Sequence, residues 1–160
     1  MLTINVICIG KLKEPYLRDA CAEYQKRLGA FCRLEITELA PAKLPENPSP
    51  ALIEAALTQE SGQILAKIPA NAKVYVLCIE GKQFTSEELS AKLISETNRG
   101  VSGIALIIGG SHGLAAQVKN RADLMLSMSK MTFPHQLARV MVLEQLYRAF
   151  MIGSGGKYHK

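Results

Sequence analysis

The end of the chain carries residues that could do chemistry. The last three are Tyr158, His159 and Lys160, and the glycines at 153, 155 and 156 precede them as a flexible joint. Tyrosine offers a ring for stacking, histidine a group that titrates near neutral pH, and lysine a cation. Most chain termini are expendable, and a disordered tail is the alternative interpretation. We expect this tail to bind substrate or move a proton.

The last long helical pattern, over residues 134–151, adds further candidates. It is apolar at most positions yet contains Arg139. Buried arginines generally have a partner or an anionic ligand, so Arg139 is a candidate functional residue. Glu144 and Arg148 are four residues apart, a spacing typical of a structural ion pair. A helix that is apolar nearly all round needs more cover than one side of a sheet supplies, which favours a homodimer.

Two loops could hold a ligand. The first, Gly109-Gly110, follows a predicted strand over residues 103–108, where glycine lets the backbone approach a ligand closely. It does not match the dinucleotide-binding glycine pattern. The second loop covers residues 128–133, and its backbone amides, with Met128 and Phe133, suit an adenine-like base. The alternatives are an ordinary strand-to-helix turn and an ordinary loop before a helix.

Length and composition predict one globular domain over residues 1–160, with 48% hydrophobic and 21% charged residues. No apolar run approaches the ~20 residues of a membrane span, and the N-terminus lacks the basic region of a signal peptide. The four cysteines fit no metal-binding spacing, so we expect free thiols and no metal site. These features predict a cytoplasmic protein that does not enter a membrane.

The net charge of +5 is unevenly placed. Residues 117–160 contain seven Lys or Arg and two Asp or Glu, whereas residues 1–116 contain twelve of each. An excess of positive charge in one third of a chain suggests an anionic partner, with nucleic acid the first candidate. Chance surface charge is the alternative.

The elements that must position these residues alternate between strand and helix. Near-continuous apolar strands are predicted at 3–9, 74–79, 103–108 and 124–127, with a more alternating strand at 32–39. Helices are predicted from Pro15 to Leu28, from Pro50 to Lys67 after an N-cap at Ser49, and after a capping box at Thr85. This order predicts an α/β fold, with a mostly parallel sheet covered by helices on both faces.

At these residues the chain resembles the RlmH family. The resemblance rests on the segment 126–136, on Arg139, on residues 144–149 and on the tail from Tyr158 to Lys160. The segments 9–13, 23–28, 81–82 and 108–110 also fit, so it spans the whole chain. Members are SPOUT-class methyltransferases that methylate N3 of a pseudouridine in 23S ribosomal RNA.

The resemblance implies a C-terminal trefoil knot, a homodimer, the ribosome as partner and S-adenosyl-L-methionine (SAM) as cofactor. Its cofactor-binding positions correspond to Leu77, Gly109, Met128, Ser129, Lys130, Met131, Thr132 and Phe133. Cys78 departs from the Asp or Glu expected after the strand leucine, so a side-chain hydrogen bond to the cofactor is not expected there.

The catalytic residues implied or inferred are His159, Tyr158 and Arg139. The resemblance implies that the tail lies near the partner's active site. We expect His159, with Lys160 or Arg139, to favour the N3 anion there and Tyr158 to orient the base. A non-catalytic ribosome-binding factor, or a SPOUT methyltransferase that acts on transfer RNA, is the alternative.

Overall fold

The computed structural model describes residues 1–159, in which strands and helices alternate. The strands are β1 (Thr3–Ile9), β2 (Arg33–Leu39), β3 (Lys73–Gln83), β4 (Gly103–Ile108) and β5 (Leu124–Ser127). The helices are α1 (Pro15–Leu28), α2 (Pro50–Lys67), α3 (Ser86–Asn98), α4 (Ala116–Asn120) and α5 (His135–Gly153). The expected strands and long helices are all confirmed within a few residues, whereas the short α4 was not expected.

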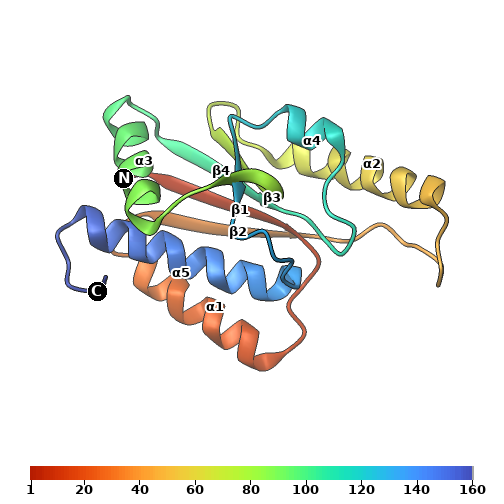
Figure 1. Cartoon of the computed structure of the whole chain (residues 1–160), viewed down its shortest axis with the longest axis horizontal. Coiled ribbons are helices and arrows are strands. Elements are labelled where there is room, and N and C mark those ends of the chain that lie inside the picture. The colour runs from red at the N-terminus through yellow and green to blue at the C-terminus, as the bar shows by residue number, and fades with distance from the viewer. Residues whose placement is uncertain (160) are drawn as a thin grey trace.

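Across the described residues the strands form one parallel sheet in the order β2-β1-β4-β3-β5 (Figure 1). The inner strands are apolar where they are buried, β1 from Val6 to Ile9 and β4 from Ile104 to Ile108, because neighbouring strands and helices cover them. Since the strands are parallel, their carboxyl ends meet at one edge of the sheet. The loops that follow β3, β4 and β5 therefore lie close together.

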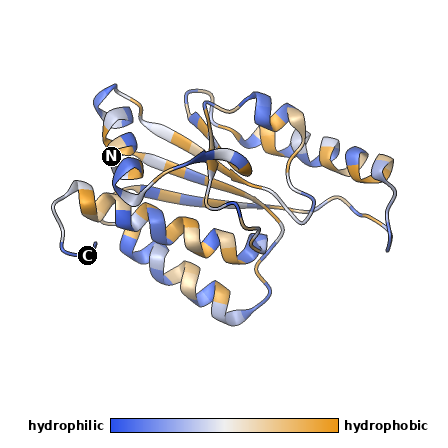
Figure 2. Ribbon diagram, in the orientation of Figure 1, coloured by the Kyte–Doolittle hydropathy of each residue, from blue (hydrophilic) through white to orange (hydrophobic). Residues whose placement is uncertain are grey.

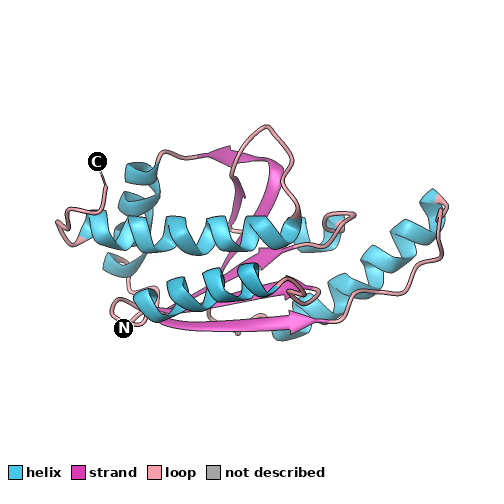
Figure 3. Cartoon of the chain, turned by 90° about the horizontal axis from the view of Figure 1, so that it is seen from below, coloured by secondary structure: helices cyan, strands magenta, loops and turns pink. Residues whose placement is uncertain are grey.

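Helices cover both faces of the sheet, as predicted. On one face α1 and α5 lie side by side, and α3 also packs against α5 (Figures 1 and 3). On the other face α2 and α4 cover a second cluster of buried side chains. Side chains along a strand point alternately to the two faces of the sheet. In β1, Ile4 and Val6 belong to the first cluster, and Ile7 and Ile9 belong to the second.

Local sequence signals explain where the helices begin. The Ser49 hydroxyl accepts from the Leu52 N–H at the start of α2. At α3, Thr85 and Glu88 form the expected capping box, each side chain bonding the other's backbone. Orange and blue alternate along α1 and α2 in Figure 2, as expected of helices with one face on the sheet.

β3 is longer than predicted, and its pairing with β5 is irregular. Leu126 pairs with both Leu77 and Lys82, so the residues between them leave the ladder. Gly81 lies directly on β5, because a Cβ built there would come within 2.7–2.8 Å of backbone atoms of Met125 and Leu126. Only glycine allows the chain to cross β5 so closely.

All four cysteines lie in the described residues and are free thiols, with Cys8, Cys21 and Cys32 buried. Burial raises the pKa of Cys32 to about 11, which keeps its thiol protonated and unreactive. Among residues 1–159, no helix combines the length and the apolar composition that crossing a membrane requires.

Candidate functional site

A pocket opens at the carboxyl edge of the sheet, with a volume of about 230 Å³. Residues 77–80 of β3, the segments that follow β4 and β5, Lys119 of α4 and the start of α5 line it. Seven of the eight expected cofactor positions are among the lining residues: Leu77, Gly109, Met128, Ser129, Met131, Thr132 and Phe133. The eighth, Lys130, is exposed and does not line the pocket. Three segments that are distant in the sequence therefore form one site.

Two serines shape the loop after β5. The buried hydroxyl of Ser127 donates to the carbonyl of Ser129 at 3.1 Å. The hydroxyl of Ser129 in turn accepts from the N–H of Met131 at 3.0 Å. These short-range bonds hold the backbone in a compact turn, a pattern that serines favour outside helices. The loop is thus ordered from within and presents its backbone to the pocket.

Gly109 forms the floor of the pocket where β4 ends. A Cβ built there would come 2.6 Å from the carbonyl oxygen of Gly113, because the chain turns back on itself in a short bridge between Gly110 and Gly113. Gly113 has a φ of +80°, which favours glycine. A side chain at position 109 would therefore displace this turn, whose residues Gly113 and Leu114 line the pocket.

One wall of the pocket contains Cys78, which the sequence marked only as a departure from the family pattern, and three residues that the sequence did not assign to the cofactor site. Cys78, Ile79 and Glu80 belong to the part of β3 that leaves the ladder, and Lys119 of α4 faces them. Glu80 forms an ion pair with Lys119, which lowers the pKa of the Glu80 carboxyl. Lys119 is therefore engaged by a carboxylate rather than free for phosphate. No local sequence pattern indicates this wall, because it forms where the pairing between β3 and β5 becomes irregular.

His135 lines the same pocket from the first turn of α5. Burial, and then the nearby charge of Arg139, lower the pKa of this histidine. Its ring is therefore neutral at neutral pH. A neutral ring is compatible with a positively charged ligand, which an imidazolium would repel.

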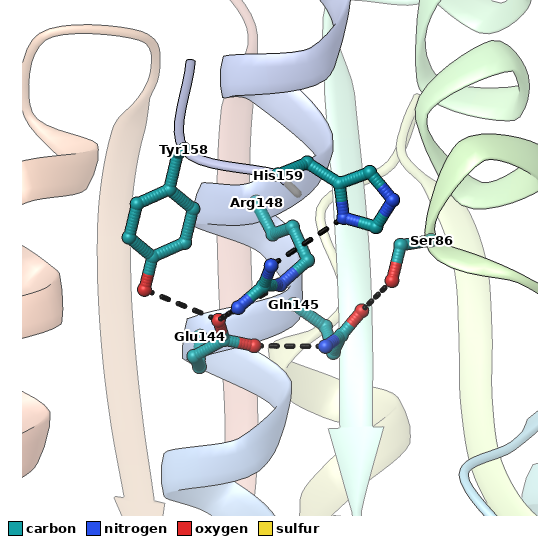
Figure 4. A network of polar contacts seen from close by, with 6 residues as sticks. All are labelled: Ser86, Glu144, Gln145, Arg148, Tyr158 and His159. Carbon is teal, nitrogen blue, oxygen red and sulfur yellow. Dashed lines mark hydrogen bonds and ion pairs between the residues drawn. The ribbon is translucent and has the colours of Figure 1, made fainter. Parts of the chain in front are cut away.

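The C-terminal tail folds back onto α5 and α3 (Figure 4). The Tyr158 hydroxyl donates to Glu144 at 3.2 Å, and the guanidinium of Arg148 lies 4.7 Å from the centre of the Tyr158 ring. Arg148 donates to the same Glu144 oxygen at 2.6 and 3.0 Å. His159 contacts Arg148 at 3.4 Å and Glu87 at 2.7 Å. Lys160 lies outside the described residues.

Aromatic packing adds to these polar contacts. Tyr158 meets the edge of Tyr147 at a centroid distance of 4.8 Å, and Tyr147 also contacts Phe31 and Tyr24. Burial, before its hydroxyl contacts, raises the pKa of Tyr158 to about 12, so the phenol stays a neutral donor at physiological pH. The tail is thus held by ring packing as well as by hydrogen bonds.

A second hollow, of about 520 Å³, lies between the pocket and the tail. Met128 lines both the pocket and this hollow. Glu144 and Gln145 also line the hollow. Figure 4 shows Glu144 bonded to Tyr158, and Gln145 bonded to Ser86. A ligand in the hollow would therefore reach the pocket at one end and the tail network at the other.

Arg139 takes a different position. It does not line the pocket or the hollow; its guanidinium donates to Glu38 at 2.6 Å and to the carbonyl of Gly10 at 3.0 Å. Arg139 and Arg148 are nine residues apart on one helix, about 13 Å along its axis. Within one chain, Arg139 and His159 are therefore not brought together.

Among residues 1–159, no group of three or more His, Cys, Asp or Glu side chains could hold a metal ion. The carboxylates of the site are already engaged, Glu80 by Lys119 and Glu144 by Arg148. The pocket itself is apolar on most of its wall, and its lining residues include three glycines, Ser129 and Thr132. This arrangement suits an uncharged ring system that carries a small polar end.

The amino-acid sequence has close relatives of known class. A protein from Bifidobacterium adolescentis called "Ribosomal RNA large subunit methyltransferase H" is 52% identical over 99% of this chain and 100% of its own length. Proteins with the same name from Streptococcus equi subsp. zooepidemicus and Streptococcus thermophilus are 49% and 50% identical over the same shares.

The fold also matches solved structures. A methylase family protein from Haemophilus influenzae aligns over 98% of this chain and 70% of its own, with a TM-score of 0.55 and 14% identity. A Legionella pneumophila protein solved with bound SAM aligns over 93% of this chain and 66% of its own, with a TM-score of 0.52 and 13% identity. At such identities the likeness concerns the fold alone.

The family model described as "Predicted SPOUT methyltransferase" matches residues 2–159. It thus covers the pocket, the hollow and the tail together. With relatives about 50% identical over their full length, the match leaves no ambiguity of class: the chain belongs to the SPOUT methyltransferase family.

Proposed function

We propose that this protein transfers a methyl group from SAM to N3 of a pseudouridine in the 23S RNA of the large ribosomal subunit. The observation that carries the proposal is the near-50% identity, over 99% of the chain, to proteins named as methyltransferases of large-subunit ribosomal RNA. The N3 position and the pseudouridine rest on the resemblance of the C-terminal motifs to the RlmH family.

The pocket is the proposed SAM site. Leu77, Met128 and Phe133 supply apolar walls for an adenine ring, and the backbone of residues 128–133 supplies polar groups for its edge. Gly109 allows the turn at Gly113 to pack directly against the end of β4, which shapes this side of the pocket. When bound, SAM supplies a methyl group on a sulfonium, whose S–C bond breaks as its electron pair returns to sulfur. Lys130 is exposed beside the pocket, so its proposed contribution to SAM binding comes from its positive charge or from its backbone groups.

The hollow is the proposed site of the target base. A base there lies between Met128 of the SAM pocket and the tail network around Glu144. The imide N3 must lose its proton to attack well, and we assign proton acceptance to His159. Tyr158, held by Glu144 and Tyr147, orients the base. The chain's main contribution is to hold nucleophile and methyl group about 3–3.5 Å apart and aligned.

We further propose a single SPOUT domain over residues 1–160 that acts as a homodimer with a C-terminal knot. The close crossing of Gly81 over β5 supports the knot. Leu137 is 39% exposed on α5, and Met141 lines the open hollow, which supports a second subunit over this helix. In such a dimer the tail of one subunit can serve the pocket of the other. A monomeric mass in solution at micromolar concentration would contradict this.

Positive charge in the C-terminal third supports an RNA partner. Lys130, in the loop of the pocket, and Lys157, next to Tyr158, are both exposed. A protein of 17.5 kDa offers little surface of its own for long RNA. We therefore propose the assembled ribosome as substrate, because it presents RNA already folded.

The test is transfer of labelled methyl from SAM to ribosomes that lack this modification, with bulk transfer RNA in parallel. We expect label in 23S RNA, at a nucleoside that co-elutes with 3-methylpseudouridine. His159→Ala should lower the single-turnover rate at least 100-fold while leaving SAM affinity within twofold. Glu54→Ala, at an exposed position of α2 that lines neither site, is the matched control.

Other outcomes assign the alternatives. Label in transfer RNA but not in ribosomes would mean a different RNA substrate. SAM binding with no label in either RNA would favour a ribosome-binding factor. Full turnover by His159→Ala would leave the methyltransferase in place but refute the assignment of the base.

A further inference from the structure

Glu87 makes a short polar contact with the tail. Its carboxylate oxygen Oε1 lies 2.7 Å from Nε2 of His159, although the residues are 72 positions apart. Glu87 sits in the first turn of α3, where the capping box fixes the backbone. Its side chain is 60% exposed, so burial does not force the contact. The proposed functions of His159 and Tyr158 assign no role to Glu87.

The two neighbours of the His159 ring select one protonation form. Arg148 lies 3.4 Å from Nδ1, and a guanidinium can only donate, so Nδ1 must accept. Nε2 faces the carboxylate of Glu87, which can only accept when ionised, so Nε2 must carry the hydrogen. A doubly protonated ring would set the Nδ1 hydrogen against the donors of Arg148. The two contacts are therefore complementary to the tautomer that carries its hydrogen on Nε2 and its lone pair on Nδ1.

The two contacts differ in strength. The 2.7 Å bond to Glu87 is short and charge-assisted, whereas 3.4 Å is at the long limit for a hydrogen bond. Arg148 already has two shorter bonds to Glu144. A substrate N–H can therefore replace Arg148 at Nδ1 while Glu87 keeps the ring in place.

We propose that Glu87 is a positioning residue for methyl transfer, which fixes the ring of His159 so that Nδ1 is the proton acceptor. The inference rests on the proposed function of His159. The N3–H bond of the base breaks, its proton moves to Nδ1, and its electron pair forms the new bond to the methyl carbon. Glu87 stabilises the resulting imidazolium and remains ionised, and the proton later passes to solvent.

The pKa of the Glu87 carboxyl group responds to this contact. The N–H of its own backbone, and then the imidazole of His159, hold the pKa of Glu87 below its ordinary range. Glu87 and His159 belong to the same chain. The pair therefore persists whichever subunit's pocket the tail serves.

A double-mutant cycle tests the proposal with the full-length protein and ribosomes that lack the methyl group. We expect Glu87→Ala to lower the single-turnover rate about tenfold, with SAM affinity unchanged by calorimetry. Glu87→Gln, which keeps an acceptor oxygen, should lose about threefold. In a His159→Ala background, Glu87→Ala should change the remaining rate less than twofold, because the residue acts through His159. Glu54→Ala is the control.

A second readout does not depend on activity. In carbon-13 NMR of the free protein, His159→Ala should raise the pKa of the Glu87 carboxyl toward its ordinary value. An unchanged Glu87 titration overturns the inference, as does an equal loss from Glu87→Ala in both backgrounds. A wild-type protein that binds SAM but methylates no RNA would overturn the proposed function, and the inference with it. An active enzyme indifferent to Glu87→Ala overturns the inference alone.

Discussion

Arg139 and Glu38 form an ion pair of 2.6 Å that joins the start of α5 to the end of β2. The guanidinium is almost fully buried, whereas the carboxylate side chain is 33% exposed. Glu38 also accepts from the backbone N–H of Leu12, so the pair ties together the segments after β1 and β2. Its geometry is that of a structural link beneath the site rather than of a group that meets substrate.

We therefore expect Arg139→Met to destabilise the fold by about 1–3 kcal/mol. The value is below that for a fully buried pair because water can reach the carboxylate that remains. Urea unfolding measures the loss, and Arg121→Met, on an exposed pair with Asp123, is the control. A 100-fold loss of methyl transfer at unchanged stability would instead support the catalytic role that the sequence suggested.

Gly81→Ala should disturb the crossing over β5. The added Cβ would meet backbone atoms of Met125 and Leu126 at 2.7–2.8 Å, and backbone cannot rotate away as a side chain can. We expect a loss of about 1–3 kcal/mol in urea unfolding. Gly62→Ala in α2 meets nothing within 4 Å and should stabilise slightly, because alanine favours helix. Equal stability of the two variants would contradict the close crossing.

Gly109→Ala should act on the cofactor pocket. Its Cβ would lie 2.6 Å from the Gly113 carbonyl oxygen, so the turn that lines the proposed SAM pocket must shift. We expect SAM affinity to fall at least tenfold by calorimetry, whereas Gly62→Ala leaves it unchanged. Unaltered affinity in a folded Gly109→Ala protein would place SAM elsewhere.

Stability should depend on pH through Glu96. This carboxylate is 5% exposed and bonded by Lys92 at 2.7 Å and by the Tyr75 hydroxyl at 3.3 Å. The bond from Lys92, before other causes, lowers its pKa. The unfolded chain, with a pKa of about 4.3, then binds the proton more readily than the native protein. Ionised Glu96 therefore contributes fully to the free energy of unfolding above the unfolded-state pKa. This contribution disappears as pH falls through the lower pKa of the native protein.

Urea unfolding at pH 6 and at pH 3 checks this for the wild type and Glu96→Gln. The wild type should lose more stability between the two pH values than the variant, which has no carboxyl at this position. Parallel losses in both proteins would show that other carboxylates account for the acid sensitivity.

Much of the site was predictable because its signals are local. Gly109 at the end of an apolar strand and the loop from Met128 to Phe133 each indicate a ligand-binding segment without reference to the rest of the chain. The rule that parallel strands end at one edge then predicts that the segments meet. Cys78 to Glu80 could not be found in this way, since they line the pocket only because β3 leaves its ladder with β5.

The amino-acid sequence by itself determined the strands, the long helices and the parallel sheet, because hydrophobic periodicity and helix caps act over a few residues. Through its motifs it also indicated the family. Only the tertiary structure decided which groups the polar residues meet. Arg139 contacts Glu38 although they are 101 residues apart in the sequence, and His159 contacts Glu87 although they are 72 residues apart. Such contacts depend on how packed elements are placed in space, which no local pattern encodes.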